Sequence, residues 1–363
     1  MIPIANPQLG TKEQEAVEEV IESGYLADGP EVREFESEFA TYCGTDHAVA
    51  TSNGTTALHA AFEALGLGDG DRVLTTPFSY IASANSIRFA GAEPVFTYIR
   101  PDTYNLNPDT VKEILETESI DAILVVHLYG LPADLDALVD IADEHNIPLV
   151  EDAAQAHGAT VDGKRVGSIG DVGCFSFYPT KNMTTGEGGM VTTDDEEIAR
   201  RAASFINHGR SEDGGNYEHV RLGHNFRMTG IAAALGRAQL ERLPEYIEQR
   251  RENAAALTDR LESTAIITPT EPENRRHVYH QYTIRCEDRD GLMNHLENEG
   301  VGSAVYYPHC IHEQPAYDHV SHEAPVAEQV SRKALSLPIH PEVGEDDIKT
   351  IGDAVLSYTE EKQ

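Results

Sequence analysis

Residues 121–157 read DAILVVHLYGLPADLDALVDIADEHNIPLVEDAAQAH, and this stretch decides the fold class. Two apolar runs, at 121–127 and 147–152, flank a segment at 135–145 whose apolar residues recur at helical spacing. A strand, a helix and a second strand in this order predict two parallel strands joined by a crossover helix. Both runs are almost continuously apolar, which is typical of strands buried on both faces.

The same rhythm continues on both sides of this unit. Further strands are predicted at 47–51, 72–76 and 93–98, and helices at 12–23, 31–42, 55–66, 82–91 and 108–117. After the central unit, two more strands at 173–180 and 188–195 enclose a loop that contains a lysine. The alternation predicts an α/β fold in which helices cover a large, mostly parallel sheet.

The pattern changes towards the C-terminus. A long helical region at 229–263 contains Pro244, which predicts a break or kink. Beyond a linker near residue 270, strands and helices predict a compact α+β unit, with helices at 289–299, 326–335 and 345–359. We therefore expect a large domain at residues 1–245 and a small domain at residues 246–363.

The charge of the chain excludes several classes of partner. Its 363 residues include 62 Asp and Glu but only 27 Lys and Arg, giving a formal charge of −35. Nucleic-acid binding needs clustered basic residues, and anionic membranes repel an acidic surface, so we expect neither partner. Only seven of the basic residues are Lys. Few lysines with a large acidic excess indicate a salt-adapted, halophilic surface, because molar salt screens self-repulsion. The alternative is an ordinary acidic cytosolic protein.

Cysteine and histidine spacing predicts no metal site. The four Cys residues, at 43, 174, 286 and 310, form no CxxC pair, and no HExxH occurs. Reduced thiols, the absence of a secretory leader and the lack of a run of ~18 apolar residues together predict a cytoplasmic location.

Three local patterns bear on chemistry. SNGTTALHAAF (52–62) opens a helix after a strand, and the free N–H groups of such a helix start bind phosphate. Asp152 ends a strand, at the edge where open α/β sheets bind ligands. Lys181 lies between two apolar strands, where loss of solvent lowers the pKa of an amine and lets it form a Schiff base with an aldehyde. Helix capping and a loop lysine are the ordinary structural alternatives.

Taken together, the three patterns match the needs of pyridoxal phosphate. A helix start anchors the phosphate, a carboxylate pairs with the pyridine nitrogen, and a lysine holds the aldehyde and later moves a proton. An aromatic side chain from FSYIAS (78–83) is expected to stack on the cofactor ring, and we choose Tyr80.

With these motifs in place, the chain resembles the sugar aminotransferases of the DegT/StrS type, a branch of the fold-type I pyridoxal phosphate enzymes. Matching stretches include VEDAAQAHGA, GCFSFYPTKNMTTGEGGMVTTDD, LGHNFRM, VYYPHCIHEQPAY and LSLPIHP. They extend from near the N-terminus to about residue 341 and so cover almost the whole chain. The resemblance implies a fold-type I aminotransferase, with a large domain, a smaller C-terminal α+β domain and pyridoxal 5′-phosphate as cofactor.

The resemblance also implies roles for single residues. Lys181 matches the lysine that holds the aldehyde, Asp152 the partner of the pyridine nitrogen, and Gln155 the residue near the ring hydroxyl. Asn225 matches an asparagine that reaches the phosphate from the neighbouring subunit, which implies a homodimer with shared active sites. The remaining cofactor contacts are implied for Gly54, Thr55, Thr56, Ser176 and Tyr80. Looser matches imply that Tyr307, His309 and His312 approach the sugar or the nucleotide.

Family substrates are nucleotide-linked keto sugars, with glutamate as the usual amino donor and amino sugars for surface glycans as products. The stretch from GHNFRM to LERLPEY resembles enzymes that aminate C4 of a 4-keto-6-deoxy sugar slightly more than enzymes that aminate C3, which remain the alternative. Dehydratases of the family replace the lysine with His, so Lys181 favours transamination. A scaffold that only retained the fold is disfavoured by the intact lysine, acid and phosphate cup. A nicotinamide-dependent enzyme is disfavoured because no GxGxxG follows the first strand.

Two further groups of residues have open roles. Nine arginines fall between residues 200 and 251, and we hypothesise that some of them steer the anionic substrate. The alternative is that they pair with Glu on helix surfaces. His127 and His157 lie at strand ends near the predicted site, where packing or hydrogen bonding is as plausible as catalysis.

Overall fold

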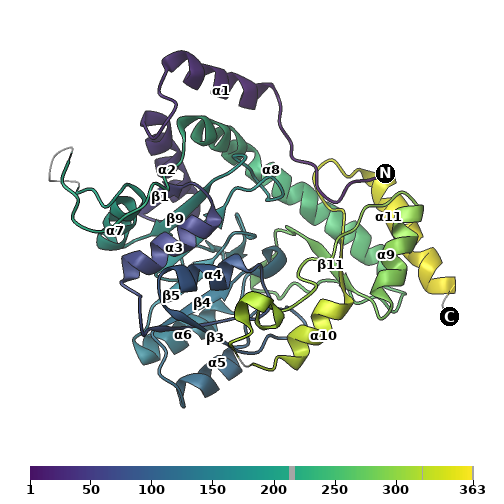
Figure 1. Ribbon diagram of the computed structural model, residues 1–363. Coiled ribbons are helices and arrows are strands. Elements are labelled where there is room, and N and C mark those ends of the chain that lie inside the picture. Colours follow the sequence, from purple (N-terminus) through teal and green to yellow (C-terminus); the bar gives the residue numbers. More distant parts are fainter. Residues whose placement is uncertain (212–216, 321, 362–363) are drawn as a thin grey trace.

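The computed structural model describes residues 1–211, 217–320 and 322–361, and a seven-stranded sheet forms its centre (Figure 1). The strands in spatial order are β1 (His47–Thr51), β9 (Gly189–Thr193), β8 (Val172–Ser176), β5 (Leu149–Asp152), β4 (Ala122–Val126), β2 (Arg72–Thr75) and β3 (Glu93–Phe96). Only β9 runs opposite to the other strands of this sheet. The predicted mostly parallel sheet is therefore confirmed. The carboxyl ends of β4, β5 and β8 lie side by side at one edge.

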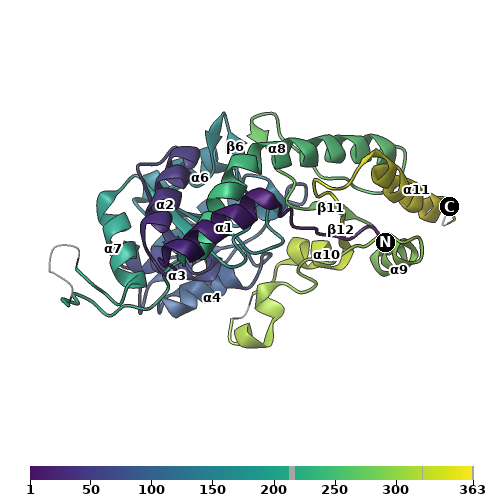
Figure 2. The ribbon, with the colours of Figure 1, turned by 90° about the horizontal axis from the view of Figure 1, so that it is seen from above.

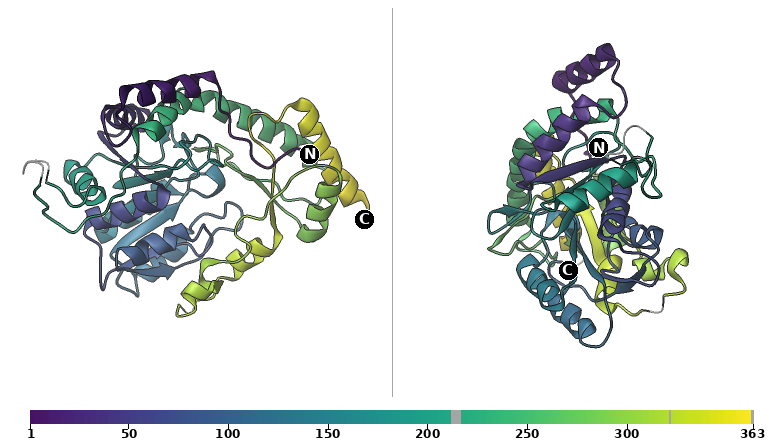
Figure 3. Two further views of the ribbon diagram at one scale, coloured as in Figure 1. Left: turned by 45° about the horizontal axis from the view of Figure 1, so that its top comes forward. Right: turned by 90° about the vertical axis from the view of Figure 1, so that its left-hand side faces the viewer.

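Successive side chains of each strand point to opposite faces of the sheet, so the apolar core forms two layers. In β4, Ile123 and Val125 belong to one apolar cluster, whereas Ala122 and Leu124 belong to the other. Side chains of a strand point alternately to opposite faces, so a run of apolar residues requires a cover on both sides. Figure 3 shows helices on both sides of the sheet.

Each layer is closed by its own set of helices. The first cluster draws on α2 (Pro30–Cys43), α6 (Leu135–His145) and the N-terminal half of α8 (Gly230–Leu261). The second draws on α3 (Gly54–Leu65), α4 (Ala82–Phe89) and α7 (Glu196–Ile206). The remaining elements of this part are α1 (Thr11–Ser23), α5 (Pro108–Leu115), η1 (Leu128–Gly130), β6 (Thr160–Val161) and β7 (Lys164–Arg165), with β10 (Arg275–Arg276) paired to β6.

A smaller α+β unit follows, as predicted. Its elements are β11 (Tyr282–Arg285), α9 (Arg289–Asn298), η2 (Ile311–Glu313), η3 (Pro315–Tyr317), α10 (Pro325–Lys333), β12 (Ala334–Leu337) and α11 (Glu345–Glu361). The predicted helix at 326–335 is too long at its C-terminal end, because ALSL (334–337) forms a strand that pairs antiparallel with β11. A run of four residues is too short to distinguish helix from strand by periodicity, and here the pairing decides.

Helix α8 joins the two parts without interruption (Figure 2). The predicted break at Pro244 is absent, since the helix continues to Leu261. A proline removes one helical hydrogen bond, but packing holds both halves: Leu243 and Ile247 lie in the first cluster, and Leu257 in the C-terminal cluster. The predicted boundary between residues 245 and 246 thus passes through a helix.

The first residues of the chain lie against the C-terminal part rather than the large one. The N–H of Ile2 donates to Gly300 O at 2.8 Å, and the N–H of Gly302 donates to Ile2 O at 2.8 Å. The two termini lie on the same side of the molecule (Figure 1). This placement departs from the predicted division, which assigned residues 1–245 to the large domain. In the described part of the chain, no helix has the length and apolarity needed to cross a membrane.

Candidate active site

Asp152 ends β5 at the carboxyl edge of the sheet and is 5% exposed. Its carboxylate accepts a 2.7 Å hydrogen bond from Ser83 Oγ and a 3.2 Å bond from the N–H of Ala154. Burial raises the pKa of Asp152, while the Ser83 hydroxyl, the Ala154 N–H and the charge of Lys181 act in the opposite direction. The two hydrogen bonds fix the orientation of the carboxylate, so it can present an acceptor to a cationic or N–H-bearing ring.

Lys181 lies in the loop between β8 and β9, as predicted, and its N–H donates to Tyr178 O at 2.8 Å. Burial lowers the pKa of Lys181 to about 8, although the nearby Asp152 carboxylate acts against this shift. An amine with this pKa is partly unprotonated near neutrality, as a nucleophile or base must be. The loop is held in place from its other end, because Thr184 Oγ1 donates to Phe177 O at 2.8 Å.

The predicted phosphate cup lies at the start of α3, and its role in binding phosphate remains a prediction. Asn53 Oδ1 accepts from the N–H of Thr56 at 2.9 Å, and Thr56 Oγ1 accepts from the N–H of Asn53 at 3.1 Å. This reciprocal cap leaves the N–H groups of Gly54 and Thr55 without a protein acceptor in the described part of the chain. Free N–H groups at a helix N-terminus, where the helix dipole is positive, favour an anion. The Thr56 hydroxyl acts as a capping group in this arrangement.

Gly54 allows α3 to approach β8 closely. A Cβ at this position would lie 2.6 Å from Ser176 Cβ, which no side chain tolerates without a backbone shift. The absence of a side chain therefore places the helix start directly beside Ser176, the last residue of β8. The structure thus brings together three of the residues expected to hold the phosphate, Gly54, Thr55 and Ser176.

Gln155 connects the sheet edge to the C-terminal part. Its Oε1 accepts from the N–H of Tyr129 at 2.9 Å, and its Nε2 donates to the hydroxyl of Tyr307 at 3.1 Å. The Tyr307 ring stacks on Tyr129 with centroids 6.2 Å apart and an interplanar angle of 8°. Tyr129 and Tyr307 have φ values of 58° and 67°, a left-handed conformation that costs energy for a non-glycine residue. Such strain is typical of residues whose position matters for function.

Two other predicted contacts lie at the surface. Tyr80 is 61% exposed, and its ring centroid is 6.4 Å from that of Tyr307. It therefore belongs to the same side of the site and leaves a ring face open. Asn225 is also exposed, and its backbone pairs with Asn207. Its neighbour Phe226 accepts a 2.6 Å hydrogen bond from the N–H of Ser52, two residues before the cup. Both roles remain predictions.

The two predicted substrate histidines differ in their surroundings. His309 is exposed, whereas the imidazole of His312 is largely buried, with Nε2 3.3 Å from Glu328 Oε1 and the ring against Phe96. No contact in the described residues joins His312 to Asp152. Contact of either histidine with substrate remains a prediction.

The structure gives His127 and His157, whose roles the sequence left open, different surroundings. His127 Nε2 is 2.9 Å from Glu151 Oε2, and both side chains are fully buried. His127 Nδ1 accepts from the N–H of Ala133, so the ring carries its proton on Nε2 and donates it to Glu151. His157 packs against Phe175, and burial lowers its pKa to about 3. His157 is therefore neutral at pH 7, and both histidines are buried groups of the framework.

Two residues that organise the site were not predicted from the sequence. Ser83 orients Asp152 across 69 positions of sequence, and Glu151 organises the loop after β7 through the N–H groups of Gly167, Ile169 and Gly170. The only signal for Ser83 was its place in FSYIAS, in the first turn of a helix that follows a strand. Glu151 alternates with Asp152 along β5, so its side chain points to the opposite face of the sheet.

The nine arginines between residues 200 and 251 are mainly engaged with carboxylates. Five of them form ion pairs: Arg200 and Arg201 with Glu197, Arg237 with Glu31 and Glu38, Arg242 with Glu13, and Arg251 with Glu271. Helix-surface pairing is therefore the main role of the stretch. Arg227 instead donates to Asn207 Oδ1 at 2.6 Å.

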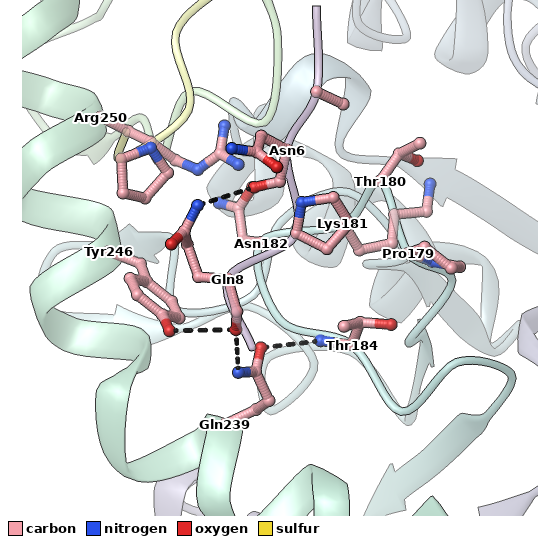
Figure 4. Close-up of a pocket in the computed structure, with 13 residues that line it drawn as sticks. Asn6, Gln8, Pro179, Thr180, Lys181, Asn182, Thr184, Gln239, Tyr246 and Arg250 are labelled. Carbon is pink, nitrogen blue, oxygen red and sulfur yellow. Dashed lines mark hydrogen bonds between the residues drawn. The ribbon is translucent and has the colours of Figure 1, made fainter. Parts of the chain in front are cut away.

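The residues at this edge fit pyridoxal phosphate. Asp152 offers an oriented buried carboxylate, Lys181 an amine of lowered pKa, and Gly54 a helix start with unpaired N–H groups. These are the three groups that an aldehyde-bearing, phosphorylated pyridine requires. Figure 4 shows a pocket beside the Lys181 loop, where Thr184 meets Gln239 of α8 and Gln239 in turn meets Gln8 of the N-terminal segment.

Comparisons with known proteins agree with this geometry. Residues 7–356 match the model of the DegT/DnrJ/EryC1/StrS aminotransferase family. A GDP-perosamine synthase of Caulobacter vibrioides is 38% identical over 96% of this chain and 96% of that protein. The dTDP-3-amino-3,4,6-trideoxy-alpha-D-glucose transaminase of Streptomyces venezuelae is 39% identical over 98% of this chain and 94% of that protein.

Solved structures share the whole fold. The crystal structure of Streptomyces venezuelae DesV superimposes with a TM-score of 0.92 at 39% identity, covering 96% of this chain and 94% of that chain. The PLP form of Spr1654 from Streptococcus pneumoniae gives 0.94 at 27% identity, covering 100% and 99%. The predicted fold, cofactor and family are thereby confirmed. The chain belongs to the DegT/DnrJ/EryC1/StrS aminotransferase family and is a pyridoxal phosphate-dependent aminotransferase of fold type I.

Proposed function

We propose that this aminotransferase moves an amino group from glutamate to the keto carbon of a nucleotide-linked sugar, in the cytoplasm, for amino-sugar and surface-glycan biosynthesis. The observation that carries the proposal is the placement of Lys181, whose pKa burial lowers to about 8, close enough to the buried Asp152 carboxylate for their charges to interact. Relatives that align over nearly the whole chain are named as enzymes of nucleotide-sugar amination.

The proposal assigns a separate role in transamination to each side chain of the site. When bound, pyridoxal phosphate supplies an electron sink that stabilises negative charge at the carbon next to the amine. Asp152, held by Ser83, keeps a proton on the pyridine nitrogen, and Lys181 Nζ takes the proton from one carbon and returns it to another. The N–H groups of Gly54 and Thr55 hold the phosphate. Gln155 and Tyr307 close the site on the side of the C-terminal part.

Within this class we place amination at C4 of a 4-keto-6-deoxy sugar first. GDP-perosamine synthases of three bacteria are 34–38% identical to this chain. The second candidate is amination at C3, supported by the names of relatives that are 36–39% identical and act on 3-oxo or 3-amino sugar nucleotides. A sugar dehydratase is the least favoured alternative, because Lys181 is retained.

We further propose that the active enzyme is a homodimer. Asn225 is exposed beside the segment that leads into the phosphate cup, so it is free to reach the cup of a second subunit. Arg221 and Arg227 flank it, and they are the members of the arginine stretch best placed to meet an anionic substrate at that junction. Size-exclusion chromatography with light scattering tests the dimer; a monomeric but active enzyme would refute it.

A substrate panel tests the function directly. The holoenzyme is incubated with glutamate and each of several GDP-, UDP- and dTDP-linked 3-keto or 4-keto sugars, and products are identified by mass spectrometry and NMR. We expect an amino sugar from a 4-keto-6-deoxy substrate and none with Lys181→Ala. Product only from a 3-keto sugar would select the second candidate, and loss of water without amination would identify a dehydratase.

A further inference from the structure

Asn182 follows Lys181 in the loop between β8 and β9, and it ties this lysine loop (residues 177–188) to a distant part of the chain. Asn182 is 4% exposed, and its Nδ2 donates a 3.1 Å hydrogen bond to Val278 O, 96 positions further along the sequence. A buried donor or acceptor that loses its partner pays the cost of desolvation, so such a bond is kept. The bond therefore restrains the backbone directly beside Lys181.

Val278 belongs to the segment that leads from the large part of the chain into the C-terminal part. This crossing segment, residues 277–281, lies between β10, which pairs with β6, and β11, which pairs with β12, and all of its residues are buried. The N–H of Val278 donates to Gly130 O at 3.0 Å, and the N–H of Gln281 donates to Tyr129 O at 3.1 Å. The crossing segment is thus held against η1 at two points.

Gly130 brings the crossing segment close to the site. Its φ is 97°, and a Cβ at this position would lie 2.8 Å from the backbone nitrogen of His280. Tyr129, the preceding residue, donates its N–H to Gln155 and stacks on Tyr307. The crossing segment therefore packs against the part of η1 that contacts Gln155 and Tyr307, the two residues at the C-terminal side of the site.

The crossing segment also lies near the lysine amine. Burial lowers the pKa of His280, and the charge of Lys181 acts in the same direction. In Figure 4 the side chains of Asn182 and Lys181 extend from the loop in different directions, so the amide acts on the lysine through the backbone.

We propose that Asn182 is a positioning residue for Lys181, because its bond to Val278 holds the lysine loop in register with the C-terminal side of the site. The proposal rests on the role that the proposed function gives to Lys181. Proton transfer requires the two groups to lie within hydrogen-bond reach, and a displacement of about 1 Å can cost ~100-fold in rate. Loss of the Asn182 bond is therefore expected to slow the chemistry more than it weakens substrate binding.

Asn182→Leu tests this role, because leucine has a similar volume but cannot donate to Val278 O. We expect kcat of the glutamate half-reaction, followed through the cofactor spectrum, to fall about 10–100-fold while the KM for glutamate stays near that of wild type. Asn253→Leu is the matched control. Asn253 is 5% exposed and its Nδ2 donates to Val343 O at 3.0 Å, but among the described residues it makes no hydrogen bond to the lysine loop. This control should lower the Tm and leave both kinetic constants unchanged.

A second measurement uses the cofactor-free protein. Burial lowers the pKa of Lys181 from 10.5 to about 8, so a loosened loop that admits water should raise this pKa again in Asn182→Leu. Only the unprotonated amine reacts with an aldehyde, so the pH dependence of the rate at which added pyridoxal phosphate gives the lysine-linked band reports the pKa. The titratable groups that interact with the lysine charge stay the same in these variants: Asp152, His157 and His280.

Asn182→Ala removes the same donor and leaves a cavity, so it should reproduce both changes and shows that they do not depend on the leucine side chain. Wild-type kinetics and an unchanged pH profile in both Asn182 variants, or equal changes in Asn253→Leu, would overturn the positioning role while leaving the proposed function intact. A wild-type protein without a lysine-linked band would overturn the role of Lys181, and with it that of Asn182.

Discussion

Gln155 Nε2 donates a 3.1 Å hydrogen bond to the hydroxyl of Tyr307, which joins the loop after β5 to the C-terminal part of the chain. The same amide accepts from the N–H of Tyr129 through Oε1. The resemblance predicts that Gln155 also lies beside the ring hydroxyl of the cofactor, and in that position it would link the cofactor to the C-terminal part. Tyr307 is consequently a positioning residue as well as a candidate for substrate contact.

Tyr307→Phe removes this link while keeping the ring stack on Tyr129. A hydrogen bond contributes about 1 kcal/mol net, so we expect roughly a fivefold loss of kcat/KM in the glutamate half-reaction, with the Tm almost unchanged. The half-reaction is followed by the change in the cofactor spectrum. Tyr306→Phe is the control, because the neighbouring ring is half-buried and makes no bond to Gln155 in the described residues. Equal kinetics of wild type and Tyr307→Phe would contradict this role.

Gly54→Ala places a methyl group 2.6 Å from the position of Ser176 Cβ. Because neither the helix start nor β8 can move freely, we expect a loss of about 1–3 kcal/mol in the free energy of unfolding and at least a tenfold weaker affinity for pyridoxal phosphate. Urea unfolding and cofactor titration measure the two effects. Gly344→Ala, where a Cβ meets nothing within 4 Å, is the matched control. Unchanged cofactor affinity would show that the cup does not need this close approach.

Glu151 links pH to stability. Burial acts to raise its pKa, but the hydrogen bond from His127 and the N–H groups of Gly167 and Gly170 lower it below 4.5. A lowered carboxyl pKa stabilises the fold above the unfolded value and loses that contribution as the pH falls through the folded value. Glu151→Gln should therefore cost about 1–3 kcal/mol at pH 7, because buried donors lose their acceptor, and the difference from wild type should shrink near pH 3.

Urea unfolding at both pH values measures the effect of Glu151→Gln. The control is Glu118→Gln, which breaks an exposed pair with Arg72 and should cost less than about 1 kcal/mol at either pH. A cost for Glu151→Gln that is the same at pH 7 and pH 3 would contradict the ionised state of the buried carboxyl.

The net charge of −35 predicts that folding needs salt. The screening length falls from ~10 Å at 0.1 M to ~3 Å at 1 M salt, so self-repulsion between surface carboxylates is weakened. We expect both stability and activity to rise steeply with sodium gluconate, since this effect depends on ionic strength and not on the anion. Full stability and activity in dilute buffer would refute the halophilic interpretation.

Local patterns in the sequence were sufficient for most of the fold and for the two central residues of the site. The apolar runs that became β4 and β5 are buried on both faces, so their composition alone identifies them. Asp152 and Lys181 could be found because Asp152 ends such a strand and Lys181 lies in the loop between two strands. In contrast, β12 has four residues and was assigned in part to a helix, since only its pairing with β11 distinguishes the two.

Contacts between distant segments could not be predicted. The Ser83–Asp152 hydrogen bond and the left-handed backbone of Tyr129 each depend on how separate elements meet in space. The continuity of α8 through Pro244 has the same origin, because packing on either side outweighs a local preference. The surroundings of His312 likewise could not be read from its motif.

The central claim is that Lys181 and Asp152 bind pyridoxal phosphate and enable it to catalyse transamination. The visible absorption spectrum of the purified holoenzyme tests this claim most directly. Wild type should show a cofactor band that glutamate bleaches and that a keto sugar nucleotide restores. Lys181→Ala should lose the lysine-linked band, and Asp152→Asn should retain it but bleach far more slowly. A wild-type protein without a cofactor band, or a lysine-linked band that persists in Lys181→Ala, would contradict the account.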